Sequence, residues 1–247
     1  MSLRFHEIAE ADHRILNPLS DQKLMLLGEI CGLGPGMRQL DLASGKGEML
    51  CRWAQRFGSG GIGVDISHIF VDAARGRARE LGVSDRVEFV TADAGHYRGD
   101  QHEFDVVSCI GATWIGSGLQ GTLRLMSPAL RPGGLMLVGE VYLNEQPPDE
   151  AFEAWGVGRD DYTSLVGTLD RIEQAGYSLI EMVLSSPDDW DRYEATQWQT
   201  LDRWLRTHPR DTDAAAVRDW MRQNRRVYLE YTRRCFGWGV FVLRADS

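Results

Sequence analysis

The chain has 247 residues, of which 43% are apolar, and a formal net charge of -9 at pH 7. This length accommodates one large α/β domain with an added segment, and the negative charge disfavours nucleic acid and anionic membranes as partners. No run of about 18 apolar residues is present, so we expect no membrane-spanning helix. The N-terminal residues lack the apolar core of a signal peptide, which predicts a cytoplasmic location.

The four cysteines are spread along the chain, and none has a second cysteine or a histidine at ligand spacing. This pattern argues against both a disulfide and a metal site, so we expect no bound metal. Buried free thiols are predicted at Cys31, Cys51, Cys109 and Cys235.

Helical and strand patterns alternate over most of the chain. Residues 1–13 show no strong period, whereas Ser20 is expected to cap a helix that extends to about Cys31. From residue 37 onwards, the alternation predicts a parallel sheet with helices on both faces and a ligand at the carboxyl ends of its strands. The predicted strands are 37–43, 61–65, 87–91, 104–110, 134–141, 178–184 and 237–243, and the predicted helices are 20–31, 47–57, 68–81, 118–130 and 162–175.

The stretch from Gln39 to Cys51 predicts a strand, a glycine turn and a helix, an arrangement that lets a ligand lie against the backbone. A dinucleotide fingerprint needs a third glycine where this chain has Leu50. Asp41 beside the turn suits an ammonium better than a pyrophosphate. Asp65 ends the next strand, where an acid can accept both hydroxyls of a ribose. A ligand made of an adenosine with a charged amino-acid tail would interact with both Asp41 and Asp65.

These residues resemble the class I S-adenosylmethionine (AdoMet)-dependent methyltransferases. The first motif of that family, D-L-G-x-G-x-G, appears here as residues 41–47 with Ala43 in place of the first glycine. The extra methyl of Ala43 should be tolerated if the backbone there keeps a φ below zero, but it leaves less room beside the methionine portion of the cofactor. Residues 87–94 and 130–136 match two further family segments, and the resemblance covers about 37–140. It implies a Rossmann-like, doubly wound α/β fold with a seven-stranded sheet whose last strand is antiparallel.

The resemblance also implies AdoMet as the cofactor and assigns residues to it. Asp93 would accept from the adenine amine, and the Ala94 N–H would donate to a ring nitrogen. Read alone, Asp93 is equally a helix or turn cap. The implied cofactor-binding residues are Asp41, Ala43, Gly45, Gly47, Asp65, Ile66, Asp93, Ala94, Ile110 and Gly111.

The loop after strand 104–110 lacks the Asn-Pro-Pro-Tyr type of motif that base-methylating and glutamine-methylating relatives carry. Both substrate classes are therefore disfavoured. Trp114 lies in this loop between glycines, where its ring could form a wall of the site, lie against the sulfonium, or serve packing alone.

About fifty residues separate the predicted sixth and seventh strands, and their pattern indicates two or three helices that cap the active edge of the sheet. Tyr193 and Trp198 are candidates for a substrate pocket. This insert resembles bacterial methyltransferases related to the ubiquinone and cyclopropane-fatty-acid methylating enzymes. We divide the chain into an N-terminal helical segment, an AdoMet-binding domain, a cap and a final strand, at 1–36, 37–186, 187–233 and 234–247.

The resemblance implies in-line transfer of a methyl group to a small-molecule acceptor, with an oxygen, nitrogen or carbon nucleophile. Glu140 at the end of the fifth strand is the candidate general base, followed by Tyr142 and His13, and a buried structural role for Glu140 is the alternative. Trp114, Tyr142 and His13 are also candidates for contact with the substrate. A lipid acceptor is disfavoured because no amphipathic membrane face is apparent. A non-catalytic AdoMet-binding protein and a nicotinamide-dependent oxidoreductase remain as alternatives. We expect a monomer or a homodimer.

Overall fold

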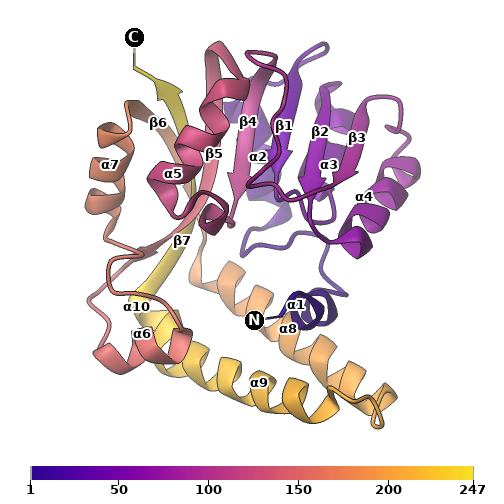
Figure 1. Ribbon diagram of the computed structural model, residues 1–247, viewed down its shortest axis with the longest axis vertical. Coiled ribbons are helices and arrows are strands. Elements are labelled where there is room, and N and C mark those ends of the chain that lie inside the picture. Colours follow the sequence, from indigo (N-terminus) through magenta and orange to yellow (C-terminus); the bar gives the residue numbers. More distant parts are fainter. Residues whose placement is uncertain (1, 247) are drawn as a thin grey trace.

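The structure, a computed structural model, describes residues 2–246 and contains a seven-stranded mixed sheet with helices on both faces (Figure 1). The strand order is β3-β2-β1-β4-β5-β7-β6, and β7 is antiparallel to both of its neighbours. The strands are β1 Arg38–Leu42, β2 Gly60–Asp65, β3 Val87–Thr91, β4 Phe104–Ile110, β5 Leu130–Leu143, β6 Tyr177–Leu184 and β7 Phe236–Ala245. The predicted fold class is confirmed.

Two groups of helices cover the sheet. One group packs on the face where Leu27 and Trp53 are buried, and its members are α2 (Asp21–Ile30), α3 (Glu48–Phe57) and α4 (His68–Glu80). The other group packs on the face where Leu123 and Ile172 are buried, and its members are α5 (Leu119–Met126) and α7 (Leu165–Gln174). Their apolar stripes meet the sheet and form the two halves of the core.

Local chemistry sets several helix ends. Ser20 caps α2 as predicted, since its hydroxyl accepts from the Lys23 N–H. The helix predicted for 118–130 is too long, because α5 ends at Met126 and a 3-10 turn, Ser127–Ala129, follows. Pro128 explains this early end: it has no N–H to continue the helix, and its ring would collide with the preceding turn.

A short helix that the sequence pattern did not indicate, α1 (Leu3–Ala9), begins the described chain. Ala9 is 1% exposed and packs in a cluster with Leu201 and Val217 of the cap. Because seven residues are too few for a stable isolated helix, these distant contacts hold α1 in place.

The insert between β6 and β7 forms the cap. It consists of α8 (Pro187–Thr207), α9 (Ala214–Val227), a π-helical turn (Tyr228–Thr232) and α10 (Arg233–Cys235), and α6 (Asp149–Trp155) packs against α9. The indole N–H of Trp198 donates to Asn224 at 3.1 Å and joins α8 to α9. In Figure 1, α8 and α9 extend across the edge where the parallel strands end, with α1 beside α8.

The four cysteines are free and buried, which confirms that prediction. No helix in the described part of the chain has the length and apolar character that a membrane span requires. Between residues 2 and 246, no three His, Cys, Asp or Glu side chains come together as a metal-binding group. The segment boundaries given above stay a prediction.

Candidate active site

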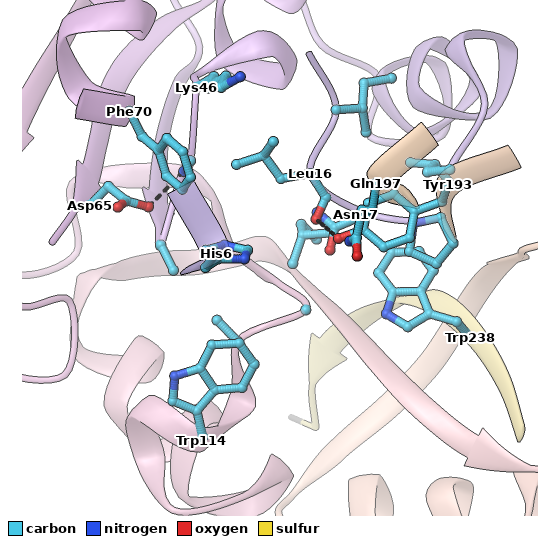
Figure 2. A pocket seen from close by; sticks show the side chains of 18 of the residues that line it. His6, Leu16, Asn17, Lys46, Asp65, Phe70, Trp114, Tyr193, Gln197 and Trp238 are labelled. Atoms are coloured by element: carbon cyan, nitrogen blue, oxygen red, sulfur yellow. Dashed lines mark hydrogen bonds between the residues drawn. The ribbon is translucent and has the colours of Figure 1, made fainter. Parts of the chain in front are cut away.

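A cavity of about 1060 Å³ lies between the strand ends and the cap. We call the part formed by the loops after β1, β2, β3 and β4 the cofactor half, and the part formed by α6, α8, α9, the π-helical turn and β7 the cap half. Figure 2 shows Asp65 and Trp114 on one side, with Tyr193, Gln197 and Trp238 on the other. Single-ligand pockets measure roughly 300–1,000 Å³, so this cavity has room for two small molecules.

The glycine turn after β1 forms one wall of the cofactor half. Gly45 has a φ of 55°, and a Cβ there would come within 2.7 Å of the Leu16 side chain. Gly47 has a φ of 66° and begins α3, where a Cβ would collide with the Phe89 ring. Gly47 does not line the cavity. Gly47 is therefore required for packing of the loop, and its position does not support the predicted contact with the cofactor.

Ala43 has an unusual backbone conformation. Its φ is 59°, in the left-handed region, so the condition of a φ below zero for an unstrained alanine is not met. This conformation costs a residue with a Cβ on the order of 1 kcal/mol. The adjoining Ser44 N–H donates to the Val64 carbonyl at 2.9 Å, which holds the turn against β2. Ala43 lines the cavity as predicted.

Two buried acids lie at the carboxyl ends of β1 and β2. Asp41 accepts from the Ser108 hydroxyl at 2.6 Å, and Asp65 accepts from the backbone N–H groups of Gly45 and Ser67 at 2.8 and 2.9 Å. Burial raises the pKa of Asp41 to about 7, although the Ser108 hydrogen bond opposes the rise. Burial also raises the pKa of Asp65, and its two backbone hydrogen bonds oppose that. A cation placed beside these carboxyls would stabilise their charged forms.

The loop after β3 brings a third acid to the cavity. Asp93 accepts from the Gly95 N–H at 2.8 Å and lies 2.8 Å from His96 Nδ1, and this hydrogen bond to His96 lowers its pKa. Ala94 beside it is buried. The structure thus brings the three predicted acids to one cavity, together with Ile66, Ala94, Ile110 and Gly111.

Gly111, at the end of β4, faces a residue that the sequence analysis did not single out. It has a φ of 78°, and a Cβ there would collide with the side-chain amide of Asn17. Asn17 lines the cavity, and Figure 2 shows it near Tyr193 and Gln197. Its amide nitrogen can donate to the Ile110 carbonyl at 3.3 Å. The Asn-Pro break before α2 was the only sequence signal for this position.

The predicted substrate residues divide into two groups. Trp114, which is 73% exposed, and Tyr193 both line the cavity. His13, Tyr142 and Trp198 do not.

Each of these three side chains has a structural partner elsewhere. His13 contacts Glu10 at 3.0 Å, and Trp198 is held by Asn224. Tyr142 packs in the core on the α7 side of the sheet. The geometry gives none of the three a contact with the cavity.

Glu140 also lies away from the cavity. Its carboxylate accepts from the Val141 N–H at 3.1 Å, and alternation along β5 places it on the same face as Tyr142. Burial raises the pKa of Glu140 to about 7, and hydrogen bonds from Thr113 and Val141 oppose the rise. The prediction of Glu140 as general base has no geometric support, and the alternative of a buried structural acid fits its surroundings.

A buried carboxylate in the loop after α1 connects the N-terminal segment to the cap. Glu10 is fully buried, and its Oε1 accepts from the Tyr193 hydroxyl at 2.6 Å and from the Gln197 amide at 2.8 Å. Tyr193 and Gln197 line the cavity from α8. Hydrogen bonding and the charge on His13 hold the pKa of Glu10 below its usual range, against the effect of burial.

Lys46 connects the same segment to the glycine turn. Its ammonium donates to the backbone carbonyls of Glu10, Ala11 and His13 at 2.7, 2.9 and 2.8 Å. No sequence pattern predicts this role for Lys46, whose place between Gly45 and Gly47 is the one sign of it in the sequence. The cofactor turn, the N-terminal segment and the cap therefore form one connected wall.

Comparison with known proteins agrees with this geometry. A family model described as "Methyltransferase domain" matches residues 40–134. A solved SAM-dependent methyltransferase from Geobacter sulfurreducens, in complex with S-adenosyl-L-homocysteine, is 44% identical, with a TM-score of 0.95 and 99% of each chain covered. Uncharacterized protein YjhP of Escherichia coli (strain K12) is 45% identical over 244 residues, which span 98% of each chain.

A more distant likeness covers about half of the chain. The ubiquinone/menaquinone biosynthesis C-methyltransferase UbiE of Ectopseudomonas mendocina (strain ymp) is 32% identical over 143 residues, or 55% of this chain and 56% of that one. The glycine turn, the acids at the strand ends and these relatives lead to one assignment. The chain belongs to the class I AdoMet-dependent methyltransferases, and AdoMet is its cofactor.

Proposed function

We infer that this methyltransferase transfers the methyl group of AdoMet to a small molecule held beneath the cap. The observation that carries the proposal is the single cavity of about 1060 Å³, which joins the three acids at the strand ends to a cap half rich in aromatic side chains. A cofactor at one end leaves the other end for an acceptor, and the cap covers that other end.

The residues of the cofactor half fit AdoMet. Asp41 is a buried acid beside a backbone turn and suits the ammonium of the methionine portion. Asp65 suits the ribose hydroxyls, and Asp93 with the Ala94 N–H suits the adenine. Gly45 lines the cavity from the glycine turn, where the absence of a side chain leaves its backbone open to a ligand.

When bound, AdoMet supplies an electrophilic methyl group on its sulfonium, so the protein mainly aligns the acceptor and excludes water. Asn17, Tyr193 and Gln197 line the cavity and lie near one another in Figure 2. Their hydrogen-bonding groups would orient an acceptor for in-line attack. We further propose that the acceptor atom is an oxygen, nitrogen or carbon nucleophile. The protein is proposed to be a monomer or a homodimer with a cytoplasmic location.

An acceptor screen tests this function. The purified protein is incubated with AdoMet and panels of phenols and alcohols, amines, and activated carbon acids, and S-adenosylhomocysteine is measured by mass spectrometry. We expect acceptor-dependent product that Asp65→Ala abolishes and that Asp72→Ala, an exposed α4 control, retains. Tight AdoMet binding without turnover of any panel would contradict a small-molecule acceptor.

A further inference from the structure

The cap half contains a buried carboxyl group that no part of the proposed cofactor site uses. Glu194 of α8 lines the cavity. Its Oε1 accepts from the indole N–H of Trp190 at a long 3.4 Å, while its Oε2 is buried without a hydrogen-bond partner. Buried carboxyl oxygens are nearly always paired, so an unpaired one beside a cavity indicates a missing partner.

The surroundings of Glu194 favour a positively charged partner. Six aromatic side chains line the cap half: Trp155, Trp190, Tyr193, Trp220, Tyr228 and Trp238. Aromatic faces attract ammonium groups. Among the described residues that line the cap half, Glu194 is the one with a formal charge, and no lysine or arginine accompanies it. An anionic acceptor group would find no complement there.

The charged groups around the subsite have partners of their own. Asp191 of α8 accepts from the Tyr228 hydroxyl at 2.8 Å and pairs with Arg233. Arg14, which lines the cavity from the loop after α1, contacts Glu80 at 3.4 Å.

The Glu10 carboxylate is shared by Tyr193, Gln197 and His13. Lys46 is held by three backbone carbonyls of the N-terminal segment. Glu10 therefore adds negative potential near Glu194, and Lys46 does not neutralise it.

We propose that Glu194 and the aromatic side chains around it form a subsite for an ammonium group of the methyl acceptor. This proposal rests on the proposed function, which places the acceptor beneath the cap. The carboxylate pairs with the cation, and the rings of Trp190 and Tyr228, whose centroids lie 6.4 Å apart, border the group. An amine or quaternary ammonium compound is the substrate class that this subsite selects.

The protonation of Glu194 gives the subsite a measurable signature. Burial raises the pKa of Glu194 to about 7, the Trp190 hydrogen bond opposes the rise, and the charge of Glu10 adds to it. The Tyr193 and Tyr228 hydroxyls, whose pKa values are raised, stay neutral nearby. A cation binds the ionised form, so its arrival below pH 7 displaces a proton, and its affinity increases as the pH rises through about 7.

Calorimetry with paired probes tests the subsite. Choline is compared with its neutral isostere 3,3-dimethylbutan-1-ol, and tyramine with tyrosol, on the protein saturated with S-adenosylhomocysteine. We expect the charged member of at least one pair to bind ten times more tightly or better. Equal affinities within both pairs, or no binding of either cation up to about 50 mM, overturn the proposal.

The variants Glu194→Gln and Asp202→Asn locate the effect. Asp202 lies on the same helix with an exposed side chain. We expect Glu194→Gln to weaken cation binding at least tenfold with S-adenosylhomocysteine affinity unchanged, and Asp202→Asn to change neither. Retained cation affinity in Glu194→Gln overturns the proposal.

A measurement on the unaltered protein covers the case in which Glu194→Gln does not fold. Calorimetric titrations with the cation are repeated in buffers of different ionisation enthalpy, which gives the number of protons released per cation bound. We expect close to one proton at pH 6 and almost none at pH 8. No release at pH 6 overturns the proposal. Turnover of neutral acceptors without cation binding would contradict the ammonium subsite and leave the proposed function standing. Cation binding without turnover of any acceptor would contradict the proposed function and leave the subsite standing.

Discussion

The backbone N–H of Gly45 donates to the carboxylate of Asp65 at 2.8 Å, which ties the turn after β1 to the end of β2. The same carboxylate accepts from the Ser67 N–H, so both of its oxygens are positioned before a ligand arrives. A group oriented in advance loses little entropy when it binds. Asp65 thus has two tasks, to shape the glycine turn and to face the cavity.

Replacing Asp65 by asparagine should weaken AdoMet binding by roughly tenfold to a hundredfold, since a charge-assisted hydrogen bond contributes about 1.5–3 kcal/mol. The dissociation constant is measured by calorimetry, with circular dichroism to verify the fold. The matched control is Asp72→Asn, on the exposed face of α4. Unchanged affinity in Asp65→Asn would remove this residue from the cofactor site.

Ala43→Gly should stabilise the protein. Relief of the left-handed conformation contributes about 1–2 kcal/mol, and the extra freedom of glycine in the unfolded chain offsets about half of that. We expect Tm to rise by about 1–4 °C in calorimetric scans. Ala73→Gly, in the exposed middle of α4, should lower it instead. A fall of equal size in both variants would contradict strain at Ala43.

Lys46→Met should loosen the N-terminal segment, because three backbone carbonyls lose a charged donor. Amide exchange over residues 2–13, followed by mass spectrometry, should accelerate by about tenfold or more. Arg56→Ala, on the exposed side of α3, serves as the control and should leave exchange of this segment unchanged. Protection that survives Lys46→Met would show that the cap contacts alone hold the segment.

Glu140→Gln should flatten the pH dependence of stability. The pKa of Glu140 is about 7 in the folded protein, above the ordinary 4.5, so its stabilising contribution is complete below about pH 4.5 and is lost as the pH rises through 7. Glutamine has no such loss. The Tm of the variant relative to the parent should therefore increase by roughly 3–6 °C between pH 5 and pH 8.

The same variant bears on catalysis. Because Glu140 does not line the cavity, we expect kcat/KM for an acceptor from the screen to stay within about twofold of the parent. A loss of a hundredfold or more would restore its assignment as the general base.

Trp114→Ala should weaken AdoMet binding by roughly tenfold without lowering stability, since the side chain is 73% exposed and lines the cavity. The adjoining Ile115 carbonyl lies near Gly95, which places this turn beside Asp93 in the cofactor half. Trp114→Phe keeps an aromatic face and should retain most of the affinity. If Trp114→Ala lowers acceptor turnover and leaves AdoMet affinity unchanged, the ring contacts the acceptor and not the cofactor.

The sheet and the acids at its edge were predictable because their signals are local. A strand of five to seven residues shows its burial pattern within itself, and the positions of Asp41, Asp65 and Asp93 follow from the strand ends. Gly45 and Gly111 carry a positive φ that glycine readily adopts. The positive φ of Ala43 could not be predicted from its residue type, because the turn imposes this conformation on whichever residue occupies the position.

The residues that were missed depend on segments far apart in the chain. The helix α1 is stable only against α8 and α9, some 200 residues later, so its seven residues show no pattern of their own. The sequence pattern placed Glu140 at the end of a strand, but β5 continues to Leu143, and its pleat turns Glu140 towards the α7 face. Glu194 looked like any helix acid until the cap placed it against a cavity.

Ser2 lines the cavity, and Figure 1 places the N-terminus beside α8 while the C-terminus lies at the opposite end of the sheet. A purification tag or fluorescent reporter fused ahead of Ser2 would therefore begin at the rim of the ligand cavity and obstruct exchange of cofactor for product. A fusion that follows Asp246 would leave that rim free. Kinetic constants for this enzyme are best obtained with the fusion partner on the C-terminal side.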